Sequence, residues 1–163
     1  MIKIKENVTL APLTTLEIGG PAEFFVEASS GEEVGEAISF AKNRDLPVTV
    51  IGGGSNLLIA DEGVSGLVIK IKNTGCRIEG EKVFTASGQN LDDLVRDTID
   101  AELGGLETLI NIPGTVGGAI YGNAGAYGRT ISDFLASVTI FDGDLPRKLS
   151  REGCRFAYRN SVF

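Results

Sequence analysis

The N-terminal part of the chain alternates short apolar runs with one amphipathic segment. Residues 22–28 have the composition of a strand, and Ser30 stands three residues before Glu33, the spacing of a helix capping box. Apolar residues then recur at three- and four-residue spacing over 34–41, which predicts a helix. The apolar run 48–51 predicts a short buried strand. A strand, a helix and a strand of these lengths indicate a βαβ unit with parallel strands.

The remaining pattern predicts a second α/β lobe after the first. In the first lobe, further strands are expected at 57–59 and 67–71, and the lobe should end near residue 73. The elements expected in the second lobe are a hairpin of 77–78 with 83–86, a helix over 91–99 capped by Asn90, and a strand over 137–141 before a turn at 142–144. We therefore predict two domains, 1–73 and 74–163.

Composition and charge narrow the class of function. The chain has 15 Lys and Arg against 22 Asp and Glu, and its net charge of −7 opposes nonspecific binding to nucleic acid. Histidine is absent, which argues against His-based catalysis and a zinc site. Cys76 and Cys154 show no metal-binding spacing and are expected to be reduced thiols. Neither a signal peptide nor a membrane span is apparent, so we expect a cytoplasmic protein without a membrane partner.

Glycine is the compositional outlier, with 22 of 163 residues, or about twice the usual share of roughly 7%. A first block, 52–56, follows the predicted strand 48–51. Its three glycines can adopt positive φ and leave several N–H groups free to converge on an anion. Leu57 stands where the third glycine of a dinucleotide fingerprint belongs, so neither that motif nor a Walker loop fits. The alternative is a plain glycine turn between strands.

A second block, 111–128, holds six glycines in 18 residues and no charged side chain. Its aliphatic residues and two tyrosines do not fit a flexible linker. The composition favours a close-packed loop whose main chain contacts a large planar or phosphorylated ligand. The alternative is a tight backbone crossing inside a core.

The last residues, 156–163, combine aromatic side chains with Arg159. Alone, they are compatible with an amphipathic strand that exposes one cation. The chain stops on the apolar Phe163 without a polar tail, which we interpret as a truncation.

Together these segments resemble the UDP-N-acetylenolpyruvoylglucosamine reductases, flavoenzymes of cell-wall precursor synthesis. The matching segments are 14–22, 52–58, 105–107, 112–119, 123–128 and the Tyr158-Arg159-x-Ser161-x-Phe163 motif. The resemblance implies an α/β (α+β) fold, the two-lobed FAD-binding fold of the vanillyl-alcohol-oxidase/PCMH type. It also implies that the FAD pyrophosphate lies between the lobes, that the isoalloxazine lies over the second lobe, and that the C-terminal substrate domain is missing.

The resemblance also implies roles for particular residues. The cofactor-binding set comprises Gly52, Gly53, Gly54, Ser55 and Asn56 as the pyrophosphate loop, and Thr115, Gly117, Gly118, Ala119, Asn123, Gly125 and Ala126 against the flavin. Arg159 matches the catalytic arginine, with Tyr158 beside it, whereas the serine matching Ser161 is structural. NADPH would reduce FAD, the flavin would pass hydride to an enolpyruvyl UDP-sugar, and a fixed guanidinium would hold the charge that develops on the carboxylate.

The same resemblance limits what this chain can do alone. The family takes its proton donor from a serine and a glutamate beyond the motif, so we expect no turnover from residues 1–163 and only weak flavin binding. We expect a small-molecule UDP-sugar substrate and no obligate protein partner. Two other classes stay open: a different FAD oxidoreductase of the same fold, and a non-catalytic domain that has lost the flavin.

Overall fold

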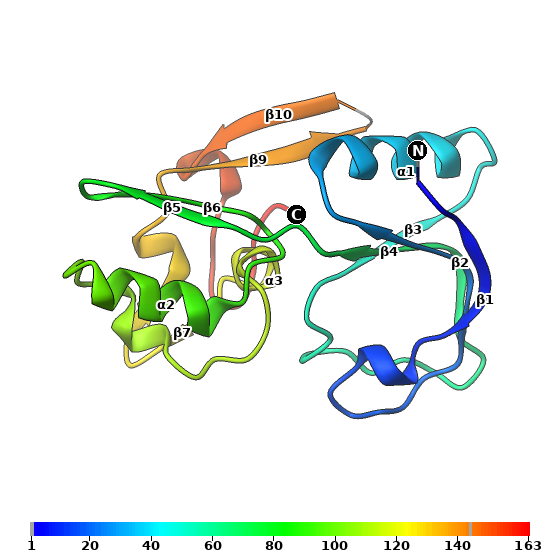
Figure 1. The fold of residues 1–163 in the computed structure, drawn as a ribbon, viewed down its shortest axis with the longest axis horizontal. Helices are drawn as coiled ribbons and strands as arrows, with labels where there is room; N and C mark the ends of the chain where they lie inside the picture. The colour runs from blue at the N-terminus through cyan, green and yellow to red at the C-terminus, as the bar shows by residue number, and fades with distance from the viewer. Residues whose placement is uncertain (1, 144) are drawn as a thin grey trace. The chain divides into compact units, whose positions relative to one another are not determined.

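The computed structural model describes residues 2–143 and 145–163. The chain forms two compact units: the first contains the residues up to Asn73 together with Gly143 and Leu145, and the second contains the other residues from Thr74 onward (Figure 1). Each unit contains both helix and strand. In the described ranges, no helix is long and apolar enough to cross a membrane.

The first unit is built on a four-stranded sheet with the strand order β1–β2–β4–β3. The strands are β1 (Lys5–Thr9), β2 (Pro21–Ala28), β3 (Val48–Ile51) and β4 (Val64–Ile71). β4 pairs in parallel with both β2 and β3, and β1 pairs antiparallel with β2. The predicted strands β2 and β3 are therefore parallel, as expected, but β4 lies between them.

Helix α1 (Gly31–Lys42) begins at the cap that the sequence indicates. Ser30 Oγ accepts a 3.2 Å hydrogen bond from the Glu33 N–H, and the Glu33 carboxylate accepts one of 2.6 Å from the N–H of Ser29. Ala37 and Ala41 of α1 are buried in one core with β2 and β4 residues, so α1 covers this face of the sheet (Figure 1). The opposite face carries a second core.

That second core joins β2, β3 and β4 to the segment that contains the 3₁₀ turn η1 (Ala11–Leu13). Its buried members are Leu10, Ala22, Phe25, Ile51 and Val68. Apolar residues of a strand alternate between the two faces, which is why Leu67 and Ile69 pack toward α1 while Val68 packs on the other side. The end of β3 is thus fixed by a buried residue, Ile51.

Two strand expectations need correction. Residues 57–59 form no strand, because their part of the chain pairs with a loop instead: the Gly20 N–H donates a 2.8 Å hydrogen bond to the Ala60 carbonyl, and Leu58 is 78% exposed. β3 is present with the predicted bounds but is not fully buried. Val50 is 57% exposed because β3 is the sheet edge, whereas α1 packs on β2 and β4.

The second unit begins with the predicted hairpin of β5 (Cys76–Glu79) and β6 (Lys82–Thr85). Helix α2 (Leu91–Asp100) follows, with Asn90 Oδ1 accepting from the N–H groups of Asp92 and Asp93 at 2.8 and 3.2 Å. The later elements are η2 (Leu106–Leu109), α3 (Val116–Tyr121), β7 (Gly125–Ala126), β8 (Arg129–Thr130), η3 (Ile131–Asp133), β9 (Ser137–Asp142), β10 (Leu145–Ser150) and η4 (Glu152–Cys154).

One core in this unit packs α2 against α3 and the turns around them. Its buried members are Leu91, Leu94, Val95, Leu109, Val116, Ala119, Ile120 and Ile131. β9 matches the predicted strand at 137–141, and it pairs with β10. The turn predicted at 142–144 includes Asp144, which lies outside the described residues. Phe163 packs against the α2–α3 core.

Candidate functional site

The first glycine block forms the loop directly after β3. Gly54 is buried and has φ +78°, a conformation that favours glycine. A Cβ at this position would lie 2.0 Å from the Leu13 carbonyl oxygen. Gly54 is therefore required both by its backbone conformation and by the close approach of the η1 turn.

Two carbonyl groups of this loop accept hydrogen bonds from other parts of the first unit. The Gly54 carbonyl accepts a 3.1 Å hydrogen bond from the Thr15 N–H, and the Gly52 carbonyl accepts one of 2.5 Å from Lys70 Nζ. Among the described residues, the N–H groups of Gly53 and Gly54 donate to no acceptor. The loop thus turns carbonyls toward the protein while donors remain available, which is the arrangement of an anion-binding nest.

Lys70 is the feature of this site that sequence reasoning missed. The loop has no basic residue, and Lys70 comes from β4, 18 residues after Gly52. Lys70 stands opposite Ile51, the last residue of β3. Burial lowers the pKa of Lys70, Lys72 lowers it further, and Glu27 opposes both effects. The sequence did contain one indication of this residue, because Lys70 is the single charged residue in the otherwise apolar run 67–71.

The second glycine block differs from the expected loop because it contains helix α3. Thr115 caps the helix, with Oγ1 accepting a 3.3 Å hydrogen bond from the Gly118 N–H. The Val116 N–H donates to the Gln89 carbonyl at 2.9 Å, and the Gly117 N–H to the Ser87 carbonyl at 2.7 Å. The first N–H groups of α3 are thus already satisfied. This segment can present a close-packed surface to a ligand but not the open donors of the first loop.

Glycine in this block also permits close backbone packing, the alternative weighed from the sequence. A Cβ at Gly117 would lie 3.0 Å from the Ser87 carbonyl oxygen, and one at Gly125 would lie 2.4 Å from that of Arg129. Gly125 pairs with Thr130 in the small β7–β8 hairpin. Gly118, by contrast, is exposed, with only Thr115 Oγ1 within 4 Å of a Cβ placed there.

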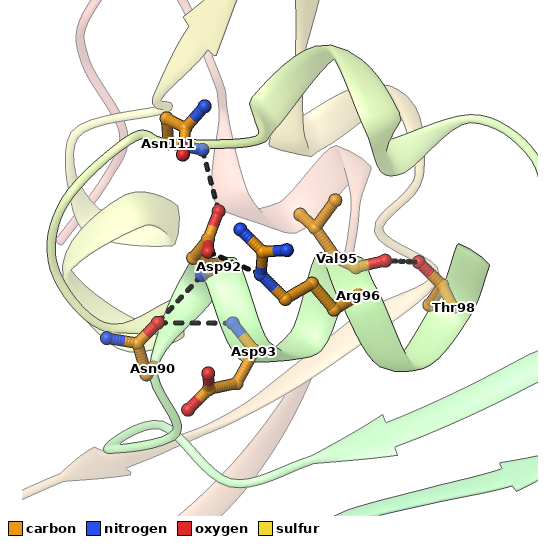
Figure 2. A network of polar contacts seen from close by, with 7 residues as sticks. All are labelled: Asn90, Asp92, Asp93, Val95, Arg96, Thr98 and Asn111. Atoms are coloured by element: carbon orange, nitrogen blue, oxygen red, sulfur yellow. Dashed lines mark hydrogen bonds and ion pairs between the residues drawn. The ribbon is translucent and has the colours of Figure 1, made fainter. Parts of the chain in front are cut away.

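The first residue of the second glycine block, Asn111, is fixed to the first turn of α2 (Figure 2). Asp92 Oδ1 accepts a 2.7 Å hydrogen bond from the Asn111 N–H, and Asp92 Oδ2 accepts one of 2.8 Å from Arg96 Nε. These contacts lower the pKa of Asp92, with the Asn111 N–H as the larger cause. The network holds the loop before α3 through a carboxylate.

The Tyr158-Arg159 pair occupies the tip of a tight turn rather than a strand. Ala157 and Asn160 exchange two main-chain hydrogen bonds of 3.0 and 3.2 Å. Tyr158 is 92% exposed, and Arg159 has φ +52°. Arg159 Nη2 donates a 3.1 Å hydrogen bond to the Gly125 carbonyl. This bond uses only one of the N–H donors of the guanidinium group.

Two buried polar residues attach this turn to α3 and its C-terminal end. Asn123 Nδ2 donates to the Ala157 carbonyl at 2.9 Å, and Ser161 Oγ donates to the Tyr121 carbonyl at 2.6 Å. Ser161 is thus engaged inside the unit. The structure brings Asn123, Gly125 and Arg159 together in the second unit, while residues 52–56 belong to the first.

The cysteines and acidic side chains are the remaining groups with possible chemistry. Cys76 and Cys154 are free thiols, and burial is the first cause that raises the pKa of each. Cys154 Sγ donates to the Ser150 carbonyl. Within the part of the chain that the structure describes, no group of three or more Cys, Asp and Glu side chains could hold a metal ion.

Comparison with known proteins shows the family to which this chain belongs. The chain matches the model of the FAD binding domain family over residues 22–144 and belongs to that family. It is 40% identical over 162 residues to the UDP-N-acetylenolpyruvoylglucosamine reductase of Solibacter usitatus, and 41% identical over 162 residues to that of Synechococcus sp. (strain JA-3-3Ab). The matches cover 99% and 98% of this chain but 52% of each relative, so the chain spans about half their length. The resemblance drawn from the motifs is confirmed.

Solved structures support the same assignment. UDP-N-acetylenolpyruvylglucosamine reductase from Thermus caldophilus has a TM-score of 0.86 and 33% identity, with 100% of this chain and 58% of that chain covered. In fold alone, the likeness extends to 6-hydroxy-D-nicotine oxidase from Arthrobacter nicotinovorans, at a TM-score of 0.65 and 20% identity over 80% of this chain and 30% of that one. The predicted α/β FAD-binding fold is confirmed.

Proposed function

We propose that this chain binds FAD and is the flavin-binding portion of an NADPH-dependent reductase. The complete enzyme would reduce UDP-N-acetylglucosamine enolpyruvate to UDP-N-acetylmuramate in peptidoglycan precursor synthesis. The observation that carries the proposal is the anion-binding loop after β3, in a chain whose family is described as an FAD binding domain. The free thiols of Cys76 and Cys154 fit a reducing compartment and support a cytoplasmic location.

The loop of residues 52–56 fits a pyrophosphate group. Available N–H donors at Gly53 and Gly54 suit phosphate oxygens, and Gly53 is exposed to a ligand. The net charge of −7 makes such local donors necessary, since the protein as a whole repels anions. We therefore assign Gly52, Gly53, Gly54, Ser55 and Asn56 to the pyrophosphate of FAD.

The second unit would present a firm surface to the flavin ring. The first N–H groups of α3 are internally satisfied, and Gly118 is exposed without a Cβ, so a planar group could approach the backbone closely. This supports a packing role, not hydrogen bonding to an anion, for the cofactor-binding set Thr115, Gly117, Gly118, Ala119, Asn123, Gly125 and Ala126.

Arg159 has the chemistry required near a substrate carboxylate. Bound FAD would supply the chemistry of accepting hydride from NADPH and donating it to a conjugated double bond. The Arg159 guanidinium is exposed and oriented by its hydrogen bond to the Gly125 carbonyl. A planar cation held in this way can bind a carboxylate through two N–H groups and stabilise the charge that grows there. Tyr158, beside it at the turn tip, is accessible to the same ligand.

The decisive experiment for the cofactor is a visible spectrum of the purified chain after addition of FAD and removal of the excess. Bound flavin absorbs near about 450 nm, whereas an apo-domain shows no such band. A retained band that disappears in Gly53→Val, but persists in the surface variant Lys72→Met, would support the loop assignment. If the wild-type chain retains no flavin and an equilibrium titration with FAD also shows no binding, the cofactor proposal fails and a non-catalytic role is favoured.

The reaction is tested in a full-length protein that contains this chain. Anaerobic reduction by NADPH followed by reoxidation with the enolpyruvyl UDP-sugar is the expected result. Reduction by NADPH without reoxidation by this substrate would instead favour an FAD oxidoreductase with another substrate.

A further inference from the structure

Lys70 supplies a cation to a loop that contains none. Its Nζ lies 2.5 Å from the Gly52 carbonyl oxygen, at the first peptide of the loop. The side chain extends from the central strand β4, on the face that carries the Ile51 and Val68 core, so its origin is rigidly fixed. The other charged groups that act on this ammonium are Glu27, in register on β2, and Lys72.

The contact between Lys70 and Gly52 determines the direction of the next donor. In a planar trans peptide, the carbonyl of one residue and the N–H of the following residue point in opposite directions. A Gly52 carbonyl turned toward the Lys70 ammonium therefore turns the Gly53 N–H away from that ammonium. This N–H donates to no acceptor among the described residues.

A run of three glycines does not hold such an orientation by itself. Glycine visits several backbone conformations with little energetic difference, so the peptide after Gly52 could rotate and present its carbonyl in place of the N–H. A carbonyl dipole in that position would repel a phosphate. Thr15 fixes the Gly54 carbonyl from the other side of the loop, which leaves the first peptide to be fixed by Lys70.

We propose that Lys70 is the positioning residue of this loop: it holds the Gly52 carbonyl so that the N–H group of Gly53 faces an anion. The anion class is a pyrophosphate, as in a dinucleotide, and this choice rests on the proposed binding of FAD. Lys70 would act through the loop backbone, and its positive charge would add a favourable field behind the N–H groups.

Two variants separate this role from a general effect of charge. Lys70→Met keeps the length and apolar stem but removes the donor and the charge, and Lys72→Met removes the same charge two residues later at an exposed position. Binding of FAD and of riboflavin, which has no phosphate, is measured for both by flavin fluorescence. We expect Lys70→Met to weaken FAD at least about 10-fold with riboflavin unchanged, Lys72→Met to change FAD less than about 3-fold, and Lys70→Arg to restore most of the affinity.

A second measurement uses inorganic pyrophosphate, followed through the backbone amide NMR signals of Gly53 and Gly54. In the wild-type chain these signals should shift with saturation, and in Lys70→Met the midpoint should rise at least about 10-fold. Equal FAD affinity in wild type and Lys70→Met would overturn the inference, as would equal losses for FAD and riboflavin or equal losses in the two Met variants. If wild type binds pyrophosphate at these amides but not FAD, only the proposed cofactor is wrong; if pyrophosphate causes no shift in wild type, the positioning role is also wrong.

Discussion

The Asp92 carboxylate accepts a 2.7 Å hydrogen bond from the Asn111 main-chain N–H, joining the first turn of α2 to the loop 19 residues later (Figure 2). The same carboxylate accepts from Arg96 Nε through its other oxygen. The loop leads to Thr115 and α3, so a carboxylate on α2 sets where the segment that we propose for flavin binding begins.

Asp92 should make the stability of the second unit depend on pH in the acid range. Its pKa is lowered from the ordinary value of 3.8, first by the Asn111 N–H and then by Arg96. The stabilisation is therefore fully present above the unfolded pKa and is lost as the pH falls through the lower, folded pKa. Urea unfolding across this range should show a smaller acid-induced loss for Asp92→Asn than for wild type. Asp93→Asn, in the same helical turn, is the matched control, and identical pH profiles for Asp92→Asn and wild type would contradict the assignment.

Gly53 and Gly54 should respond differently to substitution, although they are neighbours. Gly54→Val places a Cβ against the Leu13 carbonyl and forces a left-handed φ, which alone costs about 1–2 kcal/mol. Gly53 is exposed, so Gly53→Val should lose FAD with little change in unfolding temperature. Thermal unfolding of the two apo-variants tests this, and a Gly54→Val protein as stable as wild type would show that the loop packs differently.

Arg159→Ala in the full-length enzyme should spare reduction by NADPH and slow the step that consumes the enolpyruvyl substrate by about 10²-fold or more. The reason is that the guanidinium would meet charge that develops only in this second step. Rapid-mixing measurements of the two half-reactions provide the test. Arg155→Ala is a suitable control because Arg155 is also exposed and also has positive φ, +48°. Equal slowing of both half-reactions would make Arg159 a structural residue.

Ser161→Ala should destabilise the fold without acting on chemistry directly. It removes the 2.6 Å hydrogen bond to the Tyr121 carbonyl and leaves a part-buried acceptor unpaired, a loss of about 1–3 kcal/mol. The change is measured by urea unfolding of the apo-protein. A much larger loss of activity than of stability would assign Ser161 a part in the reaction that the family resemblance does not imply.

Elements with strong local signals could be predicted from the sequence. Ser30 and Asn90 each cap a helix at the expected residue, and the β5–β6 hairpin follows from its turn. Helix α3 could not be predicted in this way, because two glycines in six residues lower its helix propensity. The helix is instead stabilised by the burial of Val116, Ala119 and Ile120. The contact between Lys70 and Gly52 depends on pairing between separate strands, which no local pattern encodes.

Because β4 lies between β2 and β3, the shape of the proposed anion loop depends on the pairing of β4 with its two neighbours. β2 and β3 have no common partner until residues 64–71 enter the sheet, and only then does the ammonium on β4 reach the first peptide of the loop. The loop and the centre of the sheet therefore depend on the same strand pairings, whose contacts are distant in sequence and slow to close. If the loop binds the proposed anion, a substitution that loosens the central strand would weaken that binding even with every residue of the loop intact.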